Sequence, residues 1–477
     1  MRQLLLLAAA MLLVPAASAQ TFEWVYDGDF PTDTDFQYNS THGLAIDPDG
    51  KIWISPFSAT DSVLVNEFVT GTDNGYRASR VLYVFNADGT VADISPIKFV
   101  EYADGTTPDD TLGGFINSTG AWEGRSGRGL STDNDGNILA SMFDTLFKLD
   151  YETGEGLAKA VPYGGNSITA ASATPAGNVF IAPVVRTAGP ITELDASDLS
   201  VLSTLESASG FNRSILALAD GNTVISLDYT VDYSKVLTRP DAFTAFDSTF
   251  ATFYGLDIES ATRHPVSGNV WVSSGSQADT PNGVAAFETS WKSHTWYEFN
   301  PADLLTEAVP TPLDSLTWNG CTDFVEEVDG GDDIYGVCQD APIPTIGKPR
   351  AIAFSPDGET AYVANFDQLA PSIQKFVRQE VVANEPTVLA DGTLLRANAP
   401  NPFSGTTTIR FDLATASQVA VRVYDVMGRE IATLVDDALA AGPQSTTFDA
   451  GNLAAGTYLY TLEVDGQRLA RRMLVLR

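Results

Sequence analysis

The sequence predicts an all-β chain, and three observations support that prediction. A short phrase occurs six times, and each copy is an apolar run, a turn closed by glycine and a second apolar run; the copies lie at residues 43–54, 129–140, 170–181, 214–225, 261–272 and 351–363. Glycine and proline are frequent, with 39 and 25 residues, so turn residues separate short apolar runs. Beyond the first twenty residues we find no long segment with helical periodicity. Each phrase is therefore expected to form a β-hairpin.

The spacing of the six hairpins indicates how they are arranged. Their turn glycines lie 86, 41, 44, 47 and 90 residues apart and are Gly50, Gly136, Gly177, Gly221, Gly268 and Gly358. A repeat of 40 to 50 residues with four short strands per unit is typical of a β-propeller. Polar insertions at 58–78, 101–126 and 310–347 account for the two long spacings. We expect six blades, with seven or eight left open if an insertion contains a degenerate unit, and we expect residues 21–26 to pair with the last blade and close the ring.

The first residues predict export. Arg2 provides a basic start, residues 4–16 are apolar, and Ala17-Ser18-Ala19 is a small-residue cleavage site, so residues 1–19 are expected to be a signal peptide. This run is too short for a membrane anchor, and no other stretch of the sequence is long and apolar enough for a transmembrane segment. In an oxidising compartment Cys321 and Cys338 are expected to form a disulfide. A zinc site needs more ligands than these two cysteines.

The net charge of −34 is unevenly distributed along the chain. Residues 1–392 hold 53 acidic and 19 basic residues, whereas residues 393–477 hold eight of each. This asymmetry indicates a domain boundary near 385–393; together with the repeat, it predicts a propeller at 20–380, a linker at 381–392 and a separate domain at 393–477. The acidic excess argues against a nucleic-acid partner, because the phosphates would be repelled. The acidic excess indicates a well-solvated surface, with calcium binding by Asp-rich loops as the alternative.

The last segment has the pattern of a small β-sandwich, with alternating strands expected at 407–413, 419–424, 445–448, 456–464 and 468–476. Its motifs are Asn401-Pro402-Phe403, the runs 424–430 and 453–458, and the basic strand at 471–473. In these motifs it resembles the C-terminal sorting domain of type IX secretion substrates in the Bacteroidetes and their relatives. The resemblance implies an immunoglobulin-like fold, an interaction with the type IX secretion machinery, and passage through the periplasm to the cell surface or beyond. A stalk-like sandwich without a sorting role is the alternative.

The propeller segment carries a looser resemblance. Ser355-Pro356-Asp357-Gly358, followed by the run 362–365, resembles the NHL and gluconolactonase-like group of six-bladed propellers. This phrase is shared by many propeller families, so it bears on the fold more than on the activity. The acidic metal ligands of the lactonases have no matching positions that we can place in this sequence.

Few motifs point directly to catalysis or metal binding. The run 133–137 is rich in Asp and Asn, but a calcium loop of the EF-hand type needs an acidic residue where Met142 stands, and the run occupies the turn position of the repeat. A hairpin turn is therefore favoured there over a calcium site. The histidines are His42, His264 and His294, and a Ser-His-Asp triad stays open because its members can lie far apart. His264 takes the place of Asp47 beside a turn and is expected at the surface.

One position of the repeat is unusually basic. Eight residues before the turn glycines stand His42, Arg128, Thr169, Arg213, Ser260 and Arg350, with Glu259 as the alternative in the fifth copy because its turn is one residue longer. The first strand of each propeller blade lines the central channel, so equivalent positions should surround one channel mouth. Converging guanidinium groups repel one another unless acidic side chains of neighbouring blades or an anionic ligand neutralise them. His42, Arg128, Arg213 and Arg350 are therefore the candidate ligand-binding residues, with the acidic side chains as the competing explanation.

The aromatic residues suggest a second class of ligand. Trp122, Trp291 and Trp318 lie in or near insertions and could stack on the sugars of a surface glycan, although isolated surface aromatics are the commoner explanation. Trp53 and Trp271 share one repeat position and are expected in the core. The sequence favours a non-enzymatic binding or interaction module without a metal or cofactor. The alternative is a metal-dependent hydrolase or lactonase. Converging carboxylates in the channel would favour the enzyme, and a basic ring would favour anion binding.

Overall fold

A computed structural model shows a chain built almost entirely from β-strands. Contacts divide it into two compact units, of which the larger is Trp24–Arg378 and the smaller includes Gln379–Arg477. The residues that the structure describes are 21–31, 41–64, 75–104, 107, 109–185, 187, 189–205, 212–228, 233–254, 256, 258–273, 294–319, 324–328, 334–338, 345–346, 349–366, 372–381, 387–389, 392–401, 403, 405–425, 429–451, 453 and 456–475.

Six antiparallel sheets follow one another in the larger unit. The first contains β2 (Thr41–Ile46), β3 (Ile52–Pro56) and β6 (Tyr83–Phe85). The second contains β11 (Gly127–Thr132), β12 (Ile138–Met142), β13 (Thr145–Leu149) and β14 (Gly156–Ala160). The third contains β15 (Ser172–Ala173), β16 (Asn178–Ile181), β17 (Ile191–Asp195) and β18 (Val201–Leu205).

The remaining three sheets repeat this plan, and the last one incorporates the first strand of the chain. The fourth contains β19 (Asn212–Ala217), β20 (Thr223–Asp228), β21 (Ser234–Thr238) and β22 (Asp247–Thr252). The fifth contains β23 (Ala261–Arg263), β24 (Val270–Ser273), β25 (Thr295–Phe299) and β26 (Asp314–Thr317). The sixth contains β30 (Pro349–Phe354), β31 (Thr360–Asn365), β32 (Ile373–Val381) and β1 (Thr21–Asp29), so β1 lies beside β32 as the sequence predicts.

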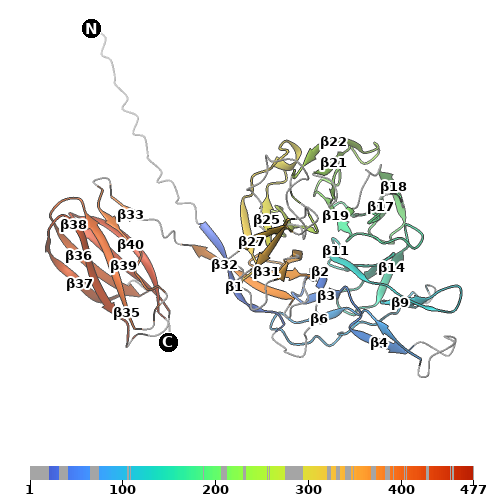
Figure 1. Cartoon of the computed structure of the whole chain (residues 1–477), viewed down its shortest axis with the longest axis horizontal. Helices are drawn as coiled ribbons and strands as arrows, with labels where there is room; N and C mark the ends of the chain where they lie inside the picture. Colours follow the sequence, from blue (N-terminus) through green and yellow to red (C-terminus); the bar gives the residue numbers. More distant parts are fainter. Residues whose placement is uncertain are drawn as a thin grey trace, which may run out of the picture. The chain divides into compact units, whose positions relative to one another are not determined.

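The first strands of the six sheets meet one another in cyclic order. β2 contacts β11, and the contacts continue through β15, β19, β23 and β30 until β30 contacts β2 again. Figure 1 shows the sheets arranged around a common centre. The inner edge of each sheet is thus the strand that opens the repeated hairpin.

Apolar cores fill the spaces between neighbouring sheets. Trp53 of the first sheet packs in one core with Phe147 of the second, and Trp271 of the fifth packs with Ile352 of the sixth. Both tryptophans are almost fully buried, so the prediction that they belong to the core is confirmed. The sixth and first sheets share a core of the same kind, so the series of cores also closes on itself.

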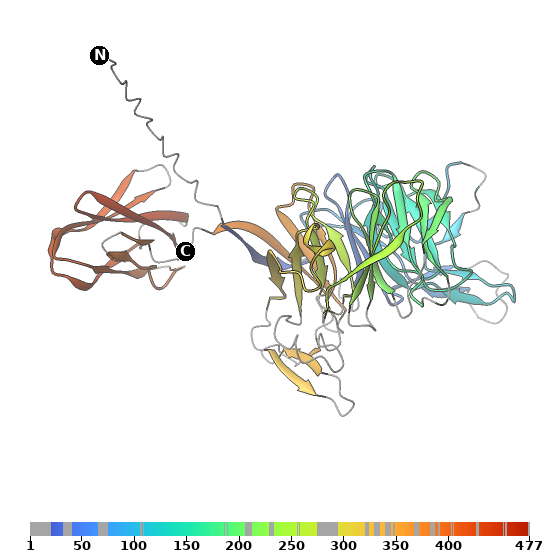
Figure 2. The same ribbon diagram turned by 90° about the horizontal axis from the view of Figure 1, so that it is seen from above.

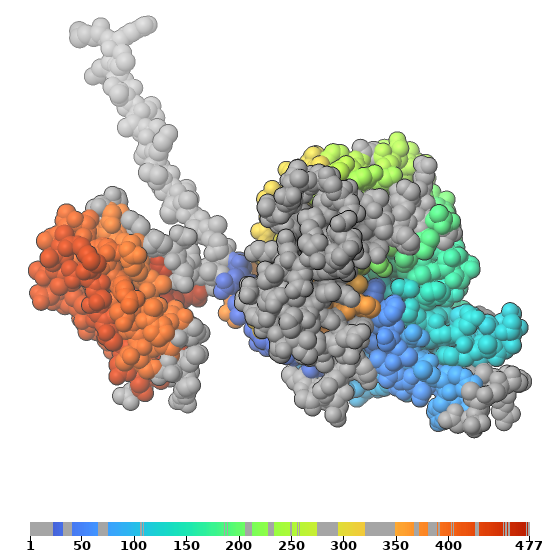
Figure 3. All heavy atoms as spheres, viewed as in Figure 1, coloured from blue at the N-terminus to red at the C-terminus, as the bar shows by residue number. Residues whose placement is uncertain are grey.

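The predicted insertion at 101–126, and segments close to it in the structure, form small hairpins outside the six sheets. They are β4 (Asp61–Leu64) with β5 (Tyr76–Ser79), β7 (Phe99–Val100) with β8 (Asp110–Thr111), and β9 (Gly114–Ile116) with β10 (Trp122–Gly124). Arg125 holds this region to the second sheet, since its guanidinium bonds Asp110 at 3.1 Å and Asp144 at 3.3 Å. In Figure 3 the β4–β5 and β9–β10 hairpins protrude at the edge of the unit.

The boundary of the third predicted insertion needs correction. Residues 310–347 are not all outside the repeat, because β26 (Asp314–Thr317) is the fourth strand of the fifth sheet and pairs with β25. The separate part begins later and includes a small sheet of β27 (Phe324–Val328), β28 (Ile334–Cys338) and β29 (Thr345–Ile346). Figure 2 shows this sheet projecting from one side of the unit. A 3-10 helix, η3 (Asp303–Leu305), precedes β26.

The smaller unit contains two sheets around one apolar core. One sheet contains β33 (Thr387–Val388), β34 (Leu394–Leu395), β35 (Thr406–Leu413) and β38 (Gly442–Asp449). The other contains β37 (Glu430–Leu439), β36 (Ser417–Asp425), β39 (Gly456–Val464) and β40 (Gln467–Val475). Alternate residues of β35 and β36 point into the shared core, as expected for half-buried strands. At its centre the hydroxyl of Tyr460 donates to the carbonyl of Arg396 at 2.9 Å and accepts from the amide of Asn398 at 2.9 Å.

Closure between the first and sixth sheets can be tested at Phe30. Its ring is 4% exposed and packs against Phe85 of the first sheet (6.0 Å between centroids) and Tyr362 of the sixth (4.8 Å). We expect Phe30→Ala to lower the free energy of unfolding by about 3–5 kcal/mol, because a large buried ring is removed. Urea unfolding followed by tryptophan fluorescence reports on this unit, since all seven tryptophans precede residue 319. Phe243→Ala, at a fully exposed ring, is the matched control and should unfold like the wild type; an equal loss in both variants would contradict the assignment.

Candidate functional site

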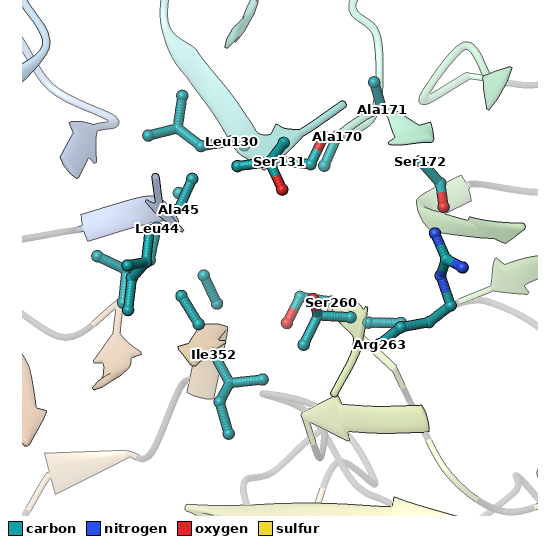
Figure 4. Close-up of a pocket in the computed structure, with 18 of the residues that line it drawn as sticks. Leu44, Ala45, Leu130, Ser131, Ala170, Ala171, Ser172, Ser260, Arg263 and Ile352 are labelled. Atoms are coloured by element: carbon teal, nitrogen blue, oxygen red, sulfur yellow. The ribbon is translucent and has the colours of Figure 1, made fainter. Parts of the chain in front are cut away.

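A cavity of about 390 Å³ runs along the centre of the larger unit, where the first strands meet. Its wall carries small and apolar residues, among them Leu44, Ala45, Leu130, Ala171 and Ile352 (Figure 4). Ligand pockets in proteins commonly enclose about 300–1,000 Å³, so this cavity has the size of a small-molecule site. We call it the central channel.

The basic residues that share one repeat position lie at one end of this channel, where the pairing of the first and second strands is irregular. Thr41 pairs with Pro56 and Gly43 pairs with Ser55, so His42 is an extra residue between two ladder pairs. Register shifts of the same kind occur at Arg128 in β11, at Arg213 in β19, and in β30 between Pro349 and Ile352, where Arg350 lies. Such β-bulges redirect a side chain relative to the strand. The column that the sequence identifies is therefore a column of bulge residues.

The structure brings all four predicted ligand-binding residues together. His42, Arg128, Arg213 and Arg350 all belong to the cavity or its rim. Burial, followed by the charges of Arg350, Arg128 and Arg213, lowers the pKa of His42 well below its ordinary value of 6.5. The imidazole is thus neutral at pH 7, and the three guanidinium groups supply the positive charge of the site.

Glu259 neutralises part of that charge. Its side chain is 1% exposed, and its carboxylate lies 3.4 Å from Nε of Arg213 and 3.3 Å from Nη1 of Arg350. Glu259 therefore occupies the fifth place of the ring, which supports it over Ser260 as the equivalent residue. Ser260 instead donates a hydrogen bond to the carbonyl of Arg350 at 2.7 Å. Acidic pairing, the competing explanation for the column, thus accounts for two of its arginines.

Arg128 differs from the other two arginines. No carboxylate within the described ranges forms an ion pair with it, and its Nε has no hydrogen-bond partner there. Burial, then the charges of Arg213 and Arg80, lower its pKa to about 10. Three arginines and one glutamate leave the ring with a net charge of +2, since 3 − 1 = 2.

Three phenylalanines support the basic side chains, and sequence reasoning missed them. Phe57, Phe143 and Phe366 each follow directly after the second strand of their hairpin, which ends at the same rim where the first strand begins. The guanidinium of Arg128 lies 5.3 Å from the Phe57 ring centroid and 5.5 Å from that of Phe143. The guanidinium of Arg350 lies 4.8 Å from Phe366. These cation–π contacts stabilise guanidinium groups that stand close to one another.

His42 takes part in the same aromatic arrangement. Its ring stacks on Phe57 with a centroid distance of 5.8 Å and meets Phe366 edge-on at 5.6 Å. The phenylalanines recur at one repeat position in three of six copies, so a second aligned column could have revealed them.

Arg80 also contributes and has no signal in the repeat, because it follows β5, outside the repeated hairpin. Its Nε donates to the carbonyl of Phe57 at 3.2 Å, and its charge is among those that lower the pKa of Arg128. Burial lowers the pKa of Arg80 itself. No described carboxylate lies within ion-pair distance of it. The mouth of the channel is therefore more cationic than the column alone indicates.

Other residues singled out in the sequence lie elsewhere. The run 133–137 forms the turn between β11 and β12, and the carboxylate of Asp133 accepts hydrogen bonds from the amides of Asp135 and Asn137 and pairs with Lys148 at 2.8 Å. His264 is not at the surface as expected: it is 5% exposed, its ring meets the carbonyl of Gly358, and it packs on Phe354 of the sixth sheet.

Some predictions fall outside the described residues. The signal peptide and Trp291 lie there, as do Cys321 and the side chain of Cys338, so the disulfide stays a prediction. Within the described ranges, no group of three or more His, Cys, Asp or Glu side chains could hold a metal ion. No helix in the same part of the chain is long and apolar enough to cross a membrane.

Comparisons with known proteins bear mainly on the smaller unit. Among solved structures, the chain is similar to one titled "Crystal Structure of Mitotic Checkpoint Complex", with 12% identity, a TM-score of 0.40, and 76% of this chain and 98% of that chain covered. It is also similar to the extracellular domain of a protein described as a one-component system from B. thetaiotaomicron, with 12% identity, a TM-score of 0.36, and 97% and 59% covered. Neither likeness carries an argument at these scores. No curated protein matches the sequence.

One family is matched over a defined segment. Residues 399–476 match the secretion system C-terminal sorting domain, which covers most of the two-sheet unit. This confirms the resemblance predicted from the motifs of that segment. The chain is therefore exported by the type IX secretion system to the cell surface or beyond, and its C-terminal domain is the part that the secretion machinery recognises.

Proposed function

We propose that the larger unit is a six-bladed β-propeller of a secreted or cell-surface protein, and that it binds a small anion at the mouth of its central channel. The cyclic contacts of the first strands and the shared core of the first and sixth sheets support the propeller. Six sheets support six blades over seven or eight. The protein acts as a binding module rather than as an enzyme, and the sorting domain delivers it to the outside.

The observation that carries the proposal is the state of Arg128. This guanidinium is largely buried, held between two phenylalanine rings, and without an ion pair among the described residues. A buried charge without a counter-ion is costly, and a bound anion removes that cost. Guanidinium groups bind carboxylates and phosphates through paired hydrogen bonds. A carboxylate, phosphate or sulfonate group placed beside Arg128 would also approach Arg80, Arg213 and Arg350.

The alternatives are less well supported by this geometry. A hydrolase or lactonase with a metal in the channel needs several converging carboxylates, but Glu259 is the carboxylate found in this ring, and it is engaged by two arginines. A glycan-binding surface needs exposed aromatic rings. Trp318 instead packs against Trp296 at a centroid distance of 6.3 Å, and the indole of Trp122 donates to the carbonyl of Ala78.

Substitution of Arg128 tests the anion site. We expect Arg128→Met to weaken binding of acetate, phosphate and methanesulfonate by about tenfold or more, because a charge-assisted hydrogen bond contributes about 1.5–3 kcal/mol. Isothermal titration against each anion measures the change. Arg378→Met, whose partner Glu359 lies in the turn between β30 and β31, is the control and should bind like the wild type. Equal affinity of the Arg128→Met variant and the wild type, or no binding by either, would refute the proposal.

His42 gives the site a pH signature. In the free protein burial and then the guanidinium groups keep its pKa low, and a bound anion raises that pKa because it cancels part of the guanidinium charge. Binding then takes up a proton, so affinity should rise as the pH falls from about 7 to 5, by at most about tenfold per pH unit. Methanesulfonate is a suitable probe because its own charge is constant over this range. His42→Gln should bind with little pH dependence, whereas His294→Gln, at a buried histidine outside the channel lining, should retain it; the same slope in all three proteins would exclude His42 as the cause.

Export can be tested separately from binding. Deletion of residues 393–477 should leave the protein in the periplasm, because the segment that the type IX machinery recognises is absent. Cell fractionation and surface proteolysis locate the protein. The full-length Arg128→Met variant is the control and should reach the surface normally. Surface delivery of the truncated chain would contradict the sorting role.

A further inference from the structure

A second cationic side chain lies in the central channel, at the end opposite the ring. Arg263 is the last residue of β23 and is part of the channel lining. Its guanidinium donates to the carbonyl of Ala173 in the third sheet, so the side chain crosses from the fifth sheet past the fourth. Figure 4 shows it extending along the side of the pocket towards Ser172. No acidic residue of the described ranges forms an ion pair with it, and burial lowers its pKa.

The strand registers place Arg263 at a defined depth. It pairs with Val270 just as Ile46 pairs with Ile52 and Ala173 pairs with Val179, so these residues form the last layer before the hairpin turns. Glu259 lies four residues earlier, at the ring. At a rise of about 3.3 Å per residue, the ring and this layer are separated by roughly 10–13 Å along the channel.

The wall between the two cationic ends combines apolar and polar side chains. Leu44, Leu130 and Ile352 line it together with alanines, and these side chains offer no hydrogen bonds. Serines also line it, and among them Ser131 has a buried Oγ with no hydrogen-bond partner within the described part of the chain. Ser131 lies one residue before the layer of Arg263, because it precedes Thr132 at the end of β11. The deep end thus offers a guanidinium and a free hydroxyl.

We propose that the ligand of this channel is an elongated dianion with an apolar middle, such as an aliphatic α,ω-dicarboxylate, bound with one end at Arg128 and the other at Arg263 and Ser131. The proposal rests on the anion site described above and adds the class and orientation of the ligand. Each anionic end meets a guanidinium that has no carboxylate partner among the described residues, and the methylene groups lie against the leucine, isoleucine and alanine side chains of the wall. With C–C bonds of about 1.5 Å, a chain of about eight carbons fits the separation of the two ends.

Ligands of matched length distinguish the contributions of the two ends of the site. Octanedioate and octanoate have the same chain length and differ only in the second carboxylate. At pH 7.5 we expect isothermal titration of the full-length protein to show octanedioate binding about tenfold or more tightly than octanoate. Butanedioate, which is too short to reach both ends, should bind no better than octanoate. Equal affinities for octanedioate and octanoate would overturn the inference.

Variants show whether a negative result contradicts only the dianion inference or also the anion site. Arg263→Gln should lower the affinity for octanedioate to that for octanoate while leaving octanoate unchanged, and Arg128→Met should weaken both. Arg378→Gln is the control for loss of an arginine outside the channel, and tryptophan fluorescence checks that each variant is folded. If octanoate binds and depends on Arg128 but the diacid has no advantage, the anion site stands and the dianion inference fails. If neither compound binds the wild type, both proposals fail.

Discussion

The close approach of the first strands is the constraint on which the rest of the larger unit depends. A side chain at Gly43 would place its Cβ 2.6 Å from the backbone nitrogen of Leu130, and one at Gly129 would stand 2.4 Å from the Cβ of Ala170. Neither position can carry a larger residue without moving a neighbouring strand. Because glycine and alanine bring the inner strands this close, their side chains leave the centre largely unfilled. The channel is therefore a consequence of how the sheets meet, and it exists without any residue dedicated to forming it.

Because the side chains that line the channel are mostly short, its few long side chains determine what it can bind. The bulges place His42 and the three arginines at one mouth, and mutual repulsion would open that mouth if nothing opposed it. Glu259 opposes it with two ion pairs, and the phenylalanines that end the second strands oppose it with their ring faces. The two sets of residues are neighbours for a simple reason: in an antiparallel hairpin, the start of one strand lies beside the end of the next. The same geometry that gathers the charge also supplies the groups that tolerate it.

How much of this could be predicted depends on whether a residue belongs to the repeat. The basic column was visible because a fixed distance from each turn glycine corresponds to a fixed height in the channel. Arg80 has no such signal because it lies outside the repeated hairpin, after β5. Arg263 was missed because the other sheets carry ordinary wall residues at its depth, such as Ile46 and Ala173. The expectation for His264 fails for a different reason: the residue lies beside the turn as the repeat predicts, but its burial is decided by Phe354 and Gly358 of the neighbouring sheet, which are distant in sequence.

The position of a cationic site in an acidic chain has a further physical consequence. Residues 1–392 carry 53 acidic side chains against 19 basic ones, so an approaching anion is repelled at long range. That repulsion is screened beyond about 10 Å at 0.1 M salt, whereas contacts inside a narrow channel are screened much less. Salt therefore removes the barrier to approach more effectively than it weakens binding. The arrangement disfavours highly charged polyanions, whose remote charges stay near the acidic surface, and it favours small or slender anions whose charges are all taken inside.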